Sequence, residues 1–230
     1  MVHWRVVKRL IVAVDGPSGA GKGTVARATA RALDYSHVDT GAMYRAVAWL
    51  VVQQHGRVDA DGAGAAARVA RDAAIDVNDG AVRIDGHDVT AAIRTPEIDM
   101  AAAAVARLPE VRAALVERQR LLGRAGGVVM EGRDIGTVVF PDADVKIYLD
   151  ASPEERARRR AADPAHTGGG AGVAHVAEGL AARDKSDSSR SVSPLTKAAD
   201  AVYIDTTGLA VEDVVAQVLA LVNERAAAGG

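Results

Sequence analysis

Hydrophobic residues alternate along this chain between short continuous runs and longer segments with helical spacing. Continuous apolar runs are typical of strands buried on both faces, whereas apolar positions three and four residues apart indicate amphipathic helices. The runs that predict strands lie at 10–15, 128–130, 145–149 and 201–204, and we place a further strand immediately before Asp39. Helical spacing follows at 25–33 and at 211–222. We therefore predict an α/β fold, with helices on both faces of a parallel five-stranded sheet.

Two segments interrupt this alternation. Residues 58–94 contain I-D-V-N-D-G-A-V-R-I-D-G, two short alternating runs joined by an Asn-Asp-Gly turn, which predicts a β-hairpin. Residues 163–174 are rich in glycine and follow an arginine-rich helical segment that begins at Pro153, a setting typical of a lid or a disordered loop. We predict one domain over 1–230 that carries a small β-containing insert at 58–94 and a lid segment at 157–180.

Composition excludes several classes of protein. With 49% hydrophobic and 25% charged residues, the 230-residue chain resembles a soluble globular protein. It has no cysteine, which excludes disulfides, thiolate metal sites and a cysteine nucleophile and favours a reducing compartment. The apolar run near the start is too short to span a membrane and lacks the small residues of a signal-peptide cleavage site. We expect a cytoplasmic protein that does not bind membranes.

Charge is balanced overall but has an arginine bias. The net charge of −2 argues against a generally basic nucleic-acid-binding protein. The positive residues are 23 arginines and 5 lysines, and guanidinium groups bind phosphate oxygens in bidentate fashion. A GC-rich genome would produce the same bias, so only the positions of the arginines can decide between the two explanations.

The most informative segment is D-G-P-S-G-A-G-K-G-T at 15–24, between a predicted strand and a predicted helix. It differs from the phosphate-binding loop pattern G-x-x-x-x-G-K-[ST] in having Gly23 where a hydroxyl is expected. Glycines there let backbone N–H groups converge on a phosphate, the helix N-terminus adds positive charge, and Lys22 reaches the outer phosphates. The segment predicts ATP or GTP binding by Gly16, Pro17, Ser18, Gly19, Ala20, Gly21, Lys22, Gly23 and Thr24.

The surrounding sequence narrows the use of the nucleotide. A guanine-reading N-K-x-D segment is absent, and the third strand ends in V-V-M-E-G-R-D rather than in the Asp-Glu pair of motor-type ATPases. These differences favour a kinase that acts on a small molecule.

Three further segments have the residue types of an anion site. D-T-G-A-M-Y-R at 39–45 places Thr40 and Arg45 at a helix N-terminus, and E-G-R-D-I-G-T at 131–137 places Arg133 and Asp134 at the carboxyl end of a strand. R-D-K-S-D-S-S-R at 183–190 spaces its arginines and Asp187 so that they share one face of a helix.

Each segment also has a simpler interpretation. Asp39 and Thr40 could only cap a helix, residues 183–190 could form a solvated ladder of ion pairs, and E-E-R-A-R-R-R at 154–160 could be an exposed helix face. Their occurrence together in a chain with a phosphate-binding loop makes these interpretations weaker.

In combination the motifs resemble the bacterial cytidylate kinase family, which belongs to the nucleoside monophosphate kinases. The resemblance rests on G-P-S-G-A-G-K-G-T, D-T-G-A-M-Y-R, I-R-T-P-E-I, G-R-D-I-G-T-V-V-F-P-D-A with K-I-Y-L-D-A-S, and R-D-x-x-D-x-x-R, in order from about residue 10 to residue 222. G-K-G-T is the usual loop ending in this family, so Gly23 is expected and Thr24 supplies the hydroxyl.

The resemblance implies transfer of the ATP γ-phosphoryl group to CMP and dCMP. Position by position, it implies that the acceptor monophosphate is surrounded by Thr40, Tyr44, Arg45, Arg133 and Arg190. It places Arg183 and Asp187 near the sugar hydroxyls and Arg112 and Asp134 at the base. A carboxylate accepts a hydrogen bond from the cytosine amino group but would repel the corresponding uracil oxygen.

For the donor, the resemblance implies that Arg159 and Arg160, with Arg156 behind them, close over the ATP phosphates. Lys22, Arg133, Arg159 and Arg160 would stabilise the charge of the transferring group, and Mg²⁺ would be held mainly by ATP phosphates and water. The acceptor is already ionised at neutral pH, so no general base is required.

Two departures from the family pattern concern the base site and the lid. Ala103 stands where many members have a serine near the base, and T-G-G-G-A-G lacks the charged helical sequence often found in the lid.

Three alternative functions stay open: a kinase that prefers UMP or acts broadly, a nucleotide- or RNA-binding regulatory protein, and an inactive kinase. Intact Lys22 and Arg45 disfavour the last. We expect a monomer that binds small nucleotides and no nucleic acid.

Overall fold

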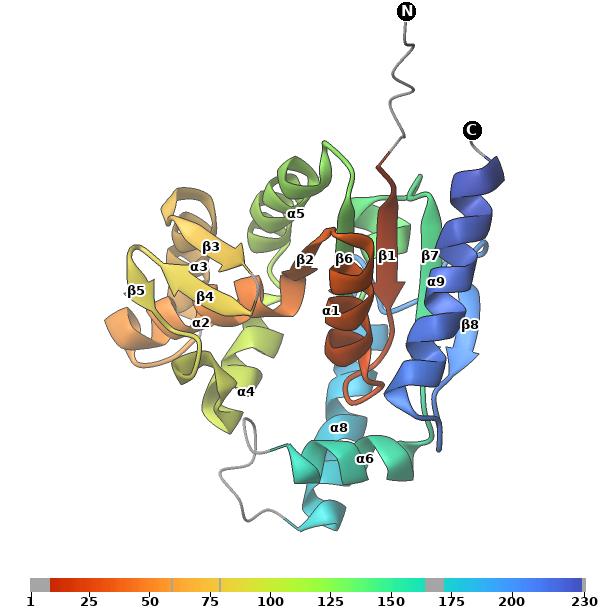
Figure 1. Cartoon of the computed structure of the whole chain (residues 1–230). Coiled ribbons are helices and arrows are strands. Elements are labelled where there is room, and N and C mark those ends of the chain that lie inside the picture. Colours follow the sequence, from red (N-terminus) through yellow and green to blue (C-terminus); the bar gives the residue numbers. More distant parts are fainter. Residues whose placement is uncertain (1–8, 59, 79, 164–171, 229–230) are drawn as a thin grey trace, which may run out of the picture.

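A computed structural model describes residues 9–58, 60–78, 80–163 and 172–228 (Figure 1). Its central sheet has five parallel strands in the order β2-β6-β1-β7-β8. They are β1 (Ile11–Asp15), β2 (Ser36–Asp39), β6 (Val128–Gly132), β7 (Val145–Asp150) and β8 (Val202–Asp205). The prediction of a parallel five-stranded sheet is confirmed. Four of the strands fall on the predicted apolar runs, whereas β2, with the sequence S-H-V-D, does not.

Helices cover both faces of this sheet. Val12 and Val14 of β1 pack in the cluster that includes α1 (Lys22–Leu33) and α9 (Val211–Ala228). Ala13, which points to the other face, packs with residues of α5 (Pro109–Gly123) and of a π-helix, η2 (Ile135–Val139). Strand β1 is therefore buried on both faces, which explains why its sequence is a continuous apolar run rather than an alternating one.

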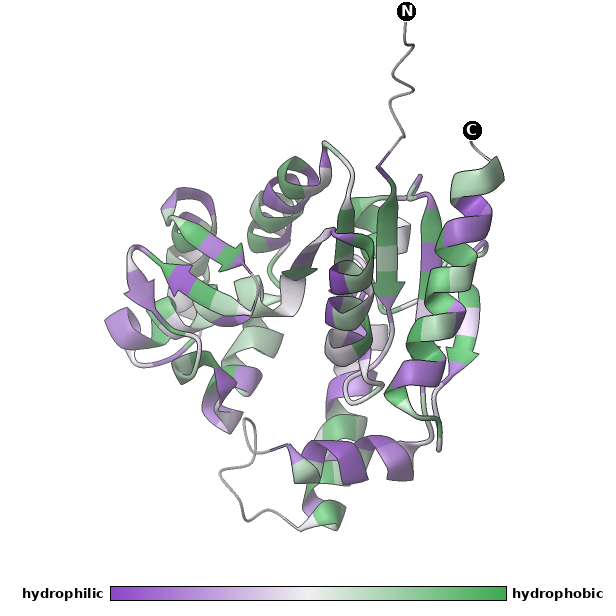
Figure 2. Cartoon of the chain, viewed as in Figure 1, coloured by the Kyte–Doolittle hydropathy of each residue, from purple (hydrophilic) through white to green (hydrophobic). Residues whose placement is uncertain are grey.

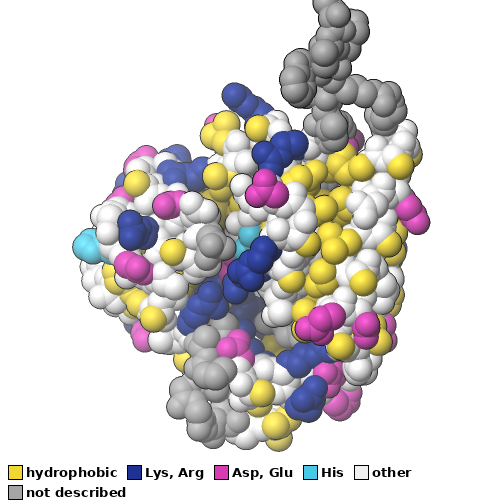
Figure 3. Space-filling view, viewed as in Figure 1, with side chains coloured by type: hydrophobic (Ala, Val, Ile, Leu, Met, Phe, Trp, Pro, Cys, Tyr) yellow, Lys and Arg dark blue, Asp and Glu magenta, His cyan; other side chains and the backbone are white. Residues whose placement is uncertain are grey.

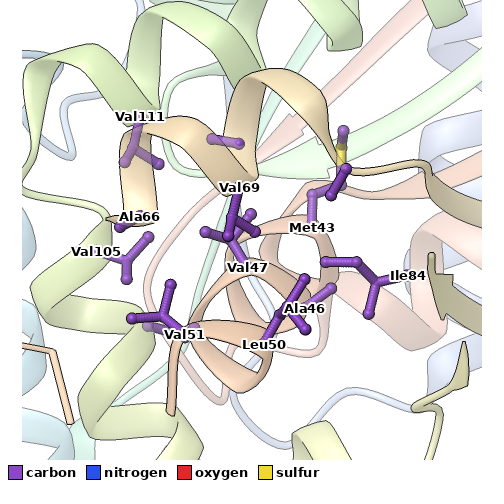
Figure 4. Close-up of a cluster of buried hydrophobic side chains, with 14 of the residues drawn as sticks. Met43, Ala46, Val47, Leu50, Val51, Ala66, Val69, Ile84, Val105 and Val111 are labelled. Carbon is purple, nitrogen blue, oxygen red and sulfur yellow. The ribbon is translucent and has the colours of Figure 1, made fainter. Parts of the chain in front are cut away.

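A second lobe lies beside the sheet, as Figure 1 shows. It contains α2 (Thr40–His55), α3 (Ala60–Asp72), β3 (Ile75–Asn78), β4 (Ala81–Ile84), β5 (His87–Asp88), the 3-10 helix η1 (Ala92–Arg94) and α4 (Pro96–Val105). The predicted hairpin is present as β3 and β4, which pair antiparallel. Figure 4 shows the core of the lobe, in which Met43 and Val47 of α2 pack with Ile84 of β4, Val105 of α4 and others. This core extends beyond residues 58–94 into α2, α4 and α5.

Two helices pack together below the carboxyl ends of the strands: α6 (Pro153–Ala162) and α8 (Val173–Ser188). Helix α6 is predominantly hydrophilic, whereas the central strands are predominantly hydrophobic (Figure 2). Most of the glycine-rich stretch predicted as part of a lid, 164–171, lies outside the described residues. Within the described part of the chain, no helix is both long and apolar enough to cross a membrane.

The structure corrects one prediction about α8. This helix ends at Ser188, so the expectation that Arg190 shares a helical face with Arg183 and Asp187 is wrong. Arg190 instead folds back from the following turn, and its Nε donates to the Asp187 carbonyl oxygen at 3.2 Å.

Candidate active site

A crevice of about 790 Å³ opens at the carboxyl ends of the central strands, between the sheet and the second lobe. Figure 3 shows lysine and arginine side chains bordering the hollow between these two parts. The predicted site residues that line it are Ser18, Gly19, Ala20, Gly21, Lys22, Gly23, Thr24, Thr40, Tyr44, Arg45, Arg112, Arg133, Asp134, Arg159, Arg160, Arg183, Asp187 and Arg190. Segments from the whole length of the chain thus meet in one place, although what each residue binds stays a prediction.

Three predicted residues, Gly16, Pro17 and Arg156, are not among those that line the crevice. Gly16 has a φ of 146°, and a Cβ there would lie 1.9 Å from the carbonyl oxygen of Leu149, so this position tolerates only glycine. Arg156 is buried behind the loop and donates through Nη1 to the Ser18 carbonyl oxygen at 3.2 Å. These residues shape the phosphate-binding loop from behind.

Lys22 is the first residue of α1, so its charge adds to that of the helix N-terminus. Its side chain folds under the loop, where Nζ donates to the Pro17 carbonyl oxygen at 2.7 Å. Burial, reinforced by the charge of Arg133, lowers the pKa of Lys22 to about 7. A bound polyphosphate would favour the charged form, because an anion compensates for the lost solvation.

Glu131 lines the same crevice and was not among the predicted site residues. Its Oε1 lies 3.0 Å from His37 Nε2, and both side chains are almost fully buried. A Cβ on Gly23 would lie only 3.1 Å from that oxygen. Gly23 therefore allows an acidic side chain from β6 to approach the first turn of α1. Glu131 could have been identified from the motif E-G-R-D, which places an acidic residue at the end of a buried strand.

The segment at 39–45 begins α2 and carries its own cap. Asp39 accepts a hydrogen bond from the Ala42 N–H group at 3.0 Å and pairs with Arg45 Nη2 at 2.8 Å. Although burial opposes ionisation, Arg45 and the Ala42 N–H group hold the pKa of Asp39 below its usual value. The hydroxyl of Thr40 donates to the Glu131 carbonyl oxygen at 2.7 Å, which joins α2 to β6. Asp39 thus caps the helix and also orients Arg45.

A carboxylate joins the two predicted phosphate-binding arginines at 133 and 190. Asp187 accepts from Arg133 Nε at 2.9 Å, and its other oxygen lies 3.3 Å from Arg190 Nη2. Although burial opposes ionisation, these two guanidinium groups lower the pKa of Asp187. The solvated ladder of ion pairs considered from the sequence does not describe this arrangement, because Asp187 and Arg190 are buried.

The predicted base-reading pair is also in contact. Arg112 donates to Asp134 Oδ2, and only 3% and 8% of their side chains are exposed. The Arg112 guanidinium lies over the ring of Tyr44, 5.5 Å from its centroid. Burial raises the pKa of Tyr44 to about 12, so its phenol stays neutral.

Several arginine donors beside this pair are buried and have no hydrogen-bond partner among the described residues. They are Arg45 Nε, Arg112 Nε and Arg183 Nε; Arg190 Nη2 also makes no hydrogen bond, although it forms the ion pair with Asp187 described above. Buried donors in native proteins are almost always satisfied, so several such groups around one crevice indicate a polar ligand.

The arginines of α6 are held differently. Arg159 donates to Glu155 Oε1 at 2.8 Å and to the hydroxyl and carbonyl oxygens of Thr206. Arg160 donates to Asp99 of α4, which lies within 3.3 Å of Arg183 Nη1 as well. Asp99 was not predicted from the sequence, and it links the second lobe to α6 and α8.

Two oxygen-bearing side chains suit a magnesium ion at this site. Mg²⁺ prefers oxygen ligands and usually keeps several waters while it binds nucleotide phosphates. Glu131 lies against the first turn of α1, where Thr24 also lines the crevice. Among the described residues no cluster of three acidic, histidine or cysteine side chains could hold a metal by itself. Thr24 and Glu131 therefore suit a Mg²⁺ ion that is bound mainly by the phosphates of a nucleotide.

The balance of charges lining the crevice favours an anionic ligand. Ten arginines and Lys22 line it, against only six aspartates and glutamates. Such an excess of positive charge in a concave site attracts polyanions. The arrangement can hold one phosphate chain on the loop at 16–24 and a second phosphate group on the opposite wall.

Comparison with known proteins gives a consistent result. The family model described as "Cytidylate kinase" matches residues 12–224. The cytidylate kinase of Desulfitobacterium hafniense (strain Y51) is 48% identical over 225 residues, which cover 96% of each chain. That of Solibacter usitatus (strain Ellin6076) is 46% identical over 228 residues, again with 96% of each chain covered. That of Geobacillus sp. (strain WCH70) is 45% identical over 218 residues, or 93% of this chain and 96% of the relative.

Proposed function

This chain belongs to the cytidylate kinase family, and from that premise we propose that it transfers the γ-phosphoryl group of ATP to CMP, giving ADP and CDP. The observation that carries the proposal is the pair of facing anion sites in one crevice. The phosphate-binding loop with Lys22 forms one side, and buried arginines with free donors form the other. A reaction between two phosphates needs both sites within one cavity. We extend the proposal to dCMP.

Charge stabilisation supplies the catalysis in this proposal. The acceptor phosphate has a second pKa near 6 and is ionised at neutral pH, so it attacks without a base. Lys22 and the N–H groups at the start of α1 bind the donor phosphates, and Arg133, held by Asp187, stabilises charge on the transferring group. Thr40, Tyr44, Arg45 and Arg190 complete the wall around the acceptor phosphate.

The base is read by Arg112 and Asp134 in this proposal, and the sugar by Arg183 and Asp187. Asp134 keeps Arg112 in place through a buried ion pair and has a second oxygen for the cytosine amino group. Ala102, Ala103 and Ala106 form a small apolar part of the same crevice. Ala103 has no hydroxyl for the base, which leaves base choice to the charged pair.

Magnesium, when bound with ATP, supplies positive charge that offsets the charge on the donor phosphates. Thr24 and Glu131 are the groups of this chain that would hold it, together with the phosphates and water. Arg159 and Arg160 lie on α6 at the donor side, where they can close over ATP and exclude water that would otherwise accept the phosphoryl group.

We also propose that the protein acts as a monomer in the cytoplasm and binds no nucleic acid. The absence of cysteine supports a reducing compartment, and the net charge of −2 argues against binding of nucleic acid.

A coupled assay of ADP release with ATP, magnesium and each of CMP, dCMP, UMP, AMP and GMP tests the proposed function. We expect CMP to have the highest kcat/KM, with dCMP next. In D134A the preference for CMP over UMP should fall by roughly tenfold or more, because the carboxylate no longer distinguishes an amino group from a carbonyl. Equal rates with CMP and AMP would overturn the base assignment. Salt-sensitive RNA binding without any diphosphate product would instead favour a regulatory protein.

A further inference from the structure

Asp15 is a buried carboxylate to which the proposed reaction gives no role. It is the last residue of β1 and lies immediately before the phosphate-binding loop, and only 5% of it is exposed. Its Oδ1 accepts a hydrogen bond from the Ile135 N–H group at 2.8 Å, and its Oδ2 accepts one from the Gly136 N–H group at 2.7 Å. Both oxygens therefore bind backbone donors that are 120 or more residues away in the sequence.

Those two N–H groups belong to the first turn of η2. The first N–H groups of any helix lack partners within the helix and need a cap. The residue at the cap position is Asp134, but its side chain makes no capping hydrogen bond and pairs with Arg112 instead. Asp15 thus supplies from β1 the cap that Asp134 cannot supply while it holds Arg112.

We propose that Asp15 is a positioning residue that fixes the Arg133–Asp134 segment in the conformation that reads the acceptor nucleotide. The proposal rests on the proposed function. Asp134 has φ −147° and ψ 26°, outside the helical and extended regions, so the segment needs an external restraint to keep this conformation. Asp15 provides that restraint through its hydrogen bonds to the backbone that follows Asp134. Because Asp15 also begins the phosphate-binding loop, these bonds connect the ATP loop to the acceptor wall.

The groups around Asp15 determine the pH at which its carboxylate is ionised. Lys22 of α1 favours its ionised form, whereas Asp134 opposes it, and Tyr148 of β7 lies beside it in the sheet. Burial raises the pKa of Asp15 to about 6, and the hydrogen bonds from Gly136 and Ile135 oppose that rise. The ionised cap is therefore present at neutral pH and is lost as the pH falls through about 6.

The variant D15N tests the proposal through substrate-specific kinetics. An asparagine of the same size can accept from one N–H group but directs its own NH₂ group at the other. We expect the KM for CMP to rise by roughly 10-fold or more and the CMP-to-UMP preference to fall, with the KM for ATP within about twofold of the wild-type value. D200N, which removes a surface partner of Lys146, is the matched control and should change neither KM.

Equal increases in both KM values would overturn the proposal, because they would show general damage to the phosphate-binding loop. An unchanged KM for CMP would overturn it as well. If D15N does not fold, the same measurements are made on D15E, whose longer carboxylate is displaced from both N–H groups.

NMR of the ligand-free wild type tests the cap without any substrate. The amide signals of Ile135 and Gly136 should titrate together with an apparent pKa of about 6. Amide shifts of Ile135 and Gly136 that are the same in D15N as in the wild type would overturn the cap. A protein that shows the titration but does not phosphorylate CMP would instead refute the proposed function and leave the cap in place.

Discussion

The arginines on the two sides of the crevice are held in contrasting ways. On the acceptor side, the side chains of Arg112 and Arg190 are 3% and 5% exposed, and each lies against a buried carboxylate. On the donor side, the Arg158 side chain of α6 is 67% exposed and pairs with Glu155 three residues earlier on the same helix. Within the described ranges, the buried arginine donors around the crevice that make no hydrogen bond lie on the acceptor side or on α1, and none is on α6.

This difference indicates that the acceptor wall is formed before substrate arrives, whereas Arg158 on the donor side is free to change its partner. Arg159 and Arg160, whose side chains are 25% and 18% exposed, lie between these two extremes. A buried guanidinium with a carboxylate partner has few alternative positions, so it can meet a phosphate at little cost in conformational entropy. Exposed pairs within one helix are weak and exchange with water. They can be replaced by phosphate contacts when ATP binds.

Matched arginine-to-methionine substitutions on the two sides of the crevice should show the largest difference in catalytic efficiency. We expect R190M to lower kcat/KM for CMP by roughly 10²- to 10³-fold, because it removes preorganised charge from the acceptor wall. R158M should lower it by less than about threefold, because the side chain is exposed. Steady-state kinetics with CMP varied at saturating ATP measure both values. Similar losses in the two variants would show that the two sides contribute equally.

Substitutions on the two sides of the crevice should also differ in their effect on the free energy of unfolding. D134A leaves the Arg112 guanidinium buried without its carboxylate, and loss of one partner of a buried pair costs about 3–5 kcal/mol in the free energy of unfolding. In E155Q, by contrast, the midpoint of urea unfolding should stay at the wild-type value, because water replaces the lost partner of Arg158 and Arg159 keeps its bonds to Thr206. Urea titrations followed by circular dichroism compare the two variants. A stable D134A protein would mean that water reaches Arg112 in the crevice.

Much of the fold was predictable because its signals are local. Four of the five strands of the central sheet contain a continuous apolar run, and the Asn-Asp-Gly turn marks the hairpin of β3 and β4. The end of α8 was not predictable from spacing, since the next residues, 189–193, include neither glycine nor proline. Helix η2 was also missed, because the carboxylate that caps it belongs to Asp15, far away in the sequence.

In the candidate site as well, residues positioned by their neighbours in the sequence were predictable, and residues positioned by distant elements were not. The phosphate-binding loop and the segment at 39–45 carry their own turn and cap residues, so the sequence located both. Glu131 and Asp99 were missed because their importance depends on neighbours from other elements: Gly23 for the former, Arg160 and Arg183 for the latter. Contacts of this kind depend on packing, which spacing along the chain does not determine. The ligand assigned to each residue stays a prediction.

The smallest expected effect concerns Glu155 and its response to salt and pH. The KM for ATP in E155Q should differ from wild type by less than about threefold, and the difference should shrink as KCl rises from about 0.05 M to about 0.5 M, because salt screens exposed pairs. The hydrogen bond from Arg158 is the main reason that the pKa of Glu155 is lowered to about 2. A group with a lowered pKa loses its ion pair only in acid, so the difference in KM should be constant from about pH 5.5 to about pH 8.5. A large difference that persists in high salt would show that Glu155 fixes the donor arginines as firmly as Asp134 and Asp187 fix those of the acceptor wall.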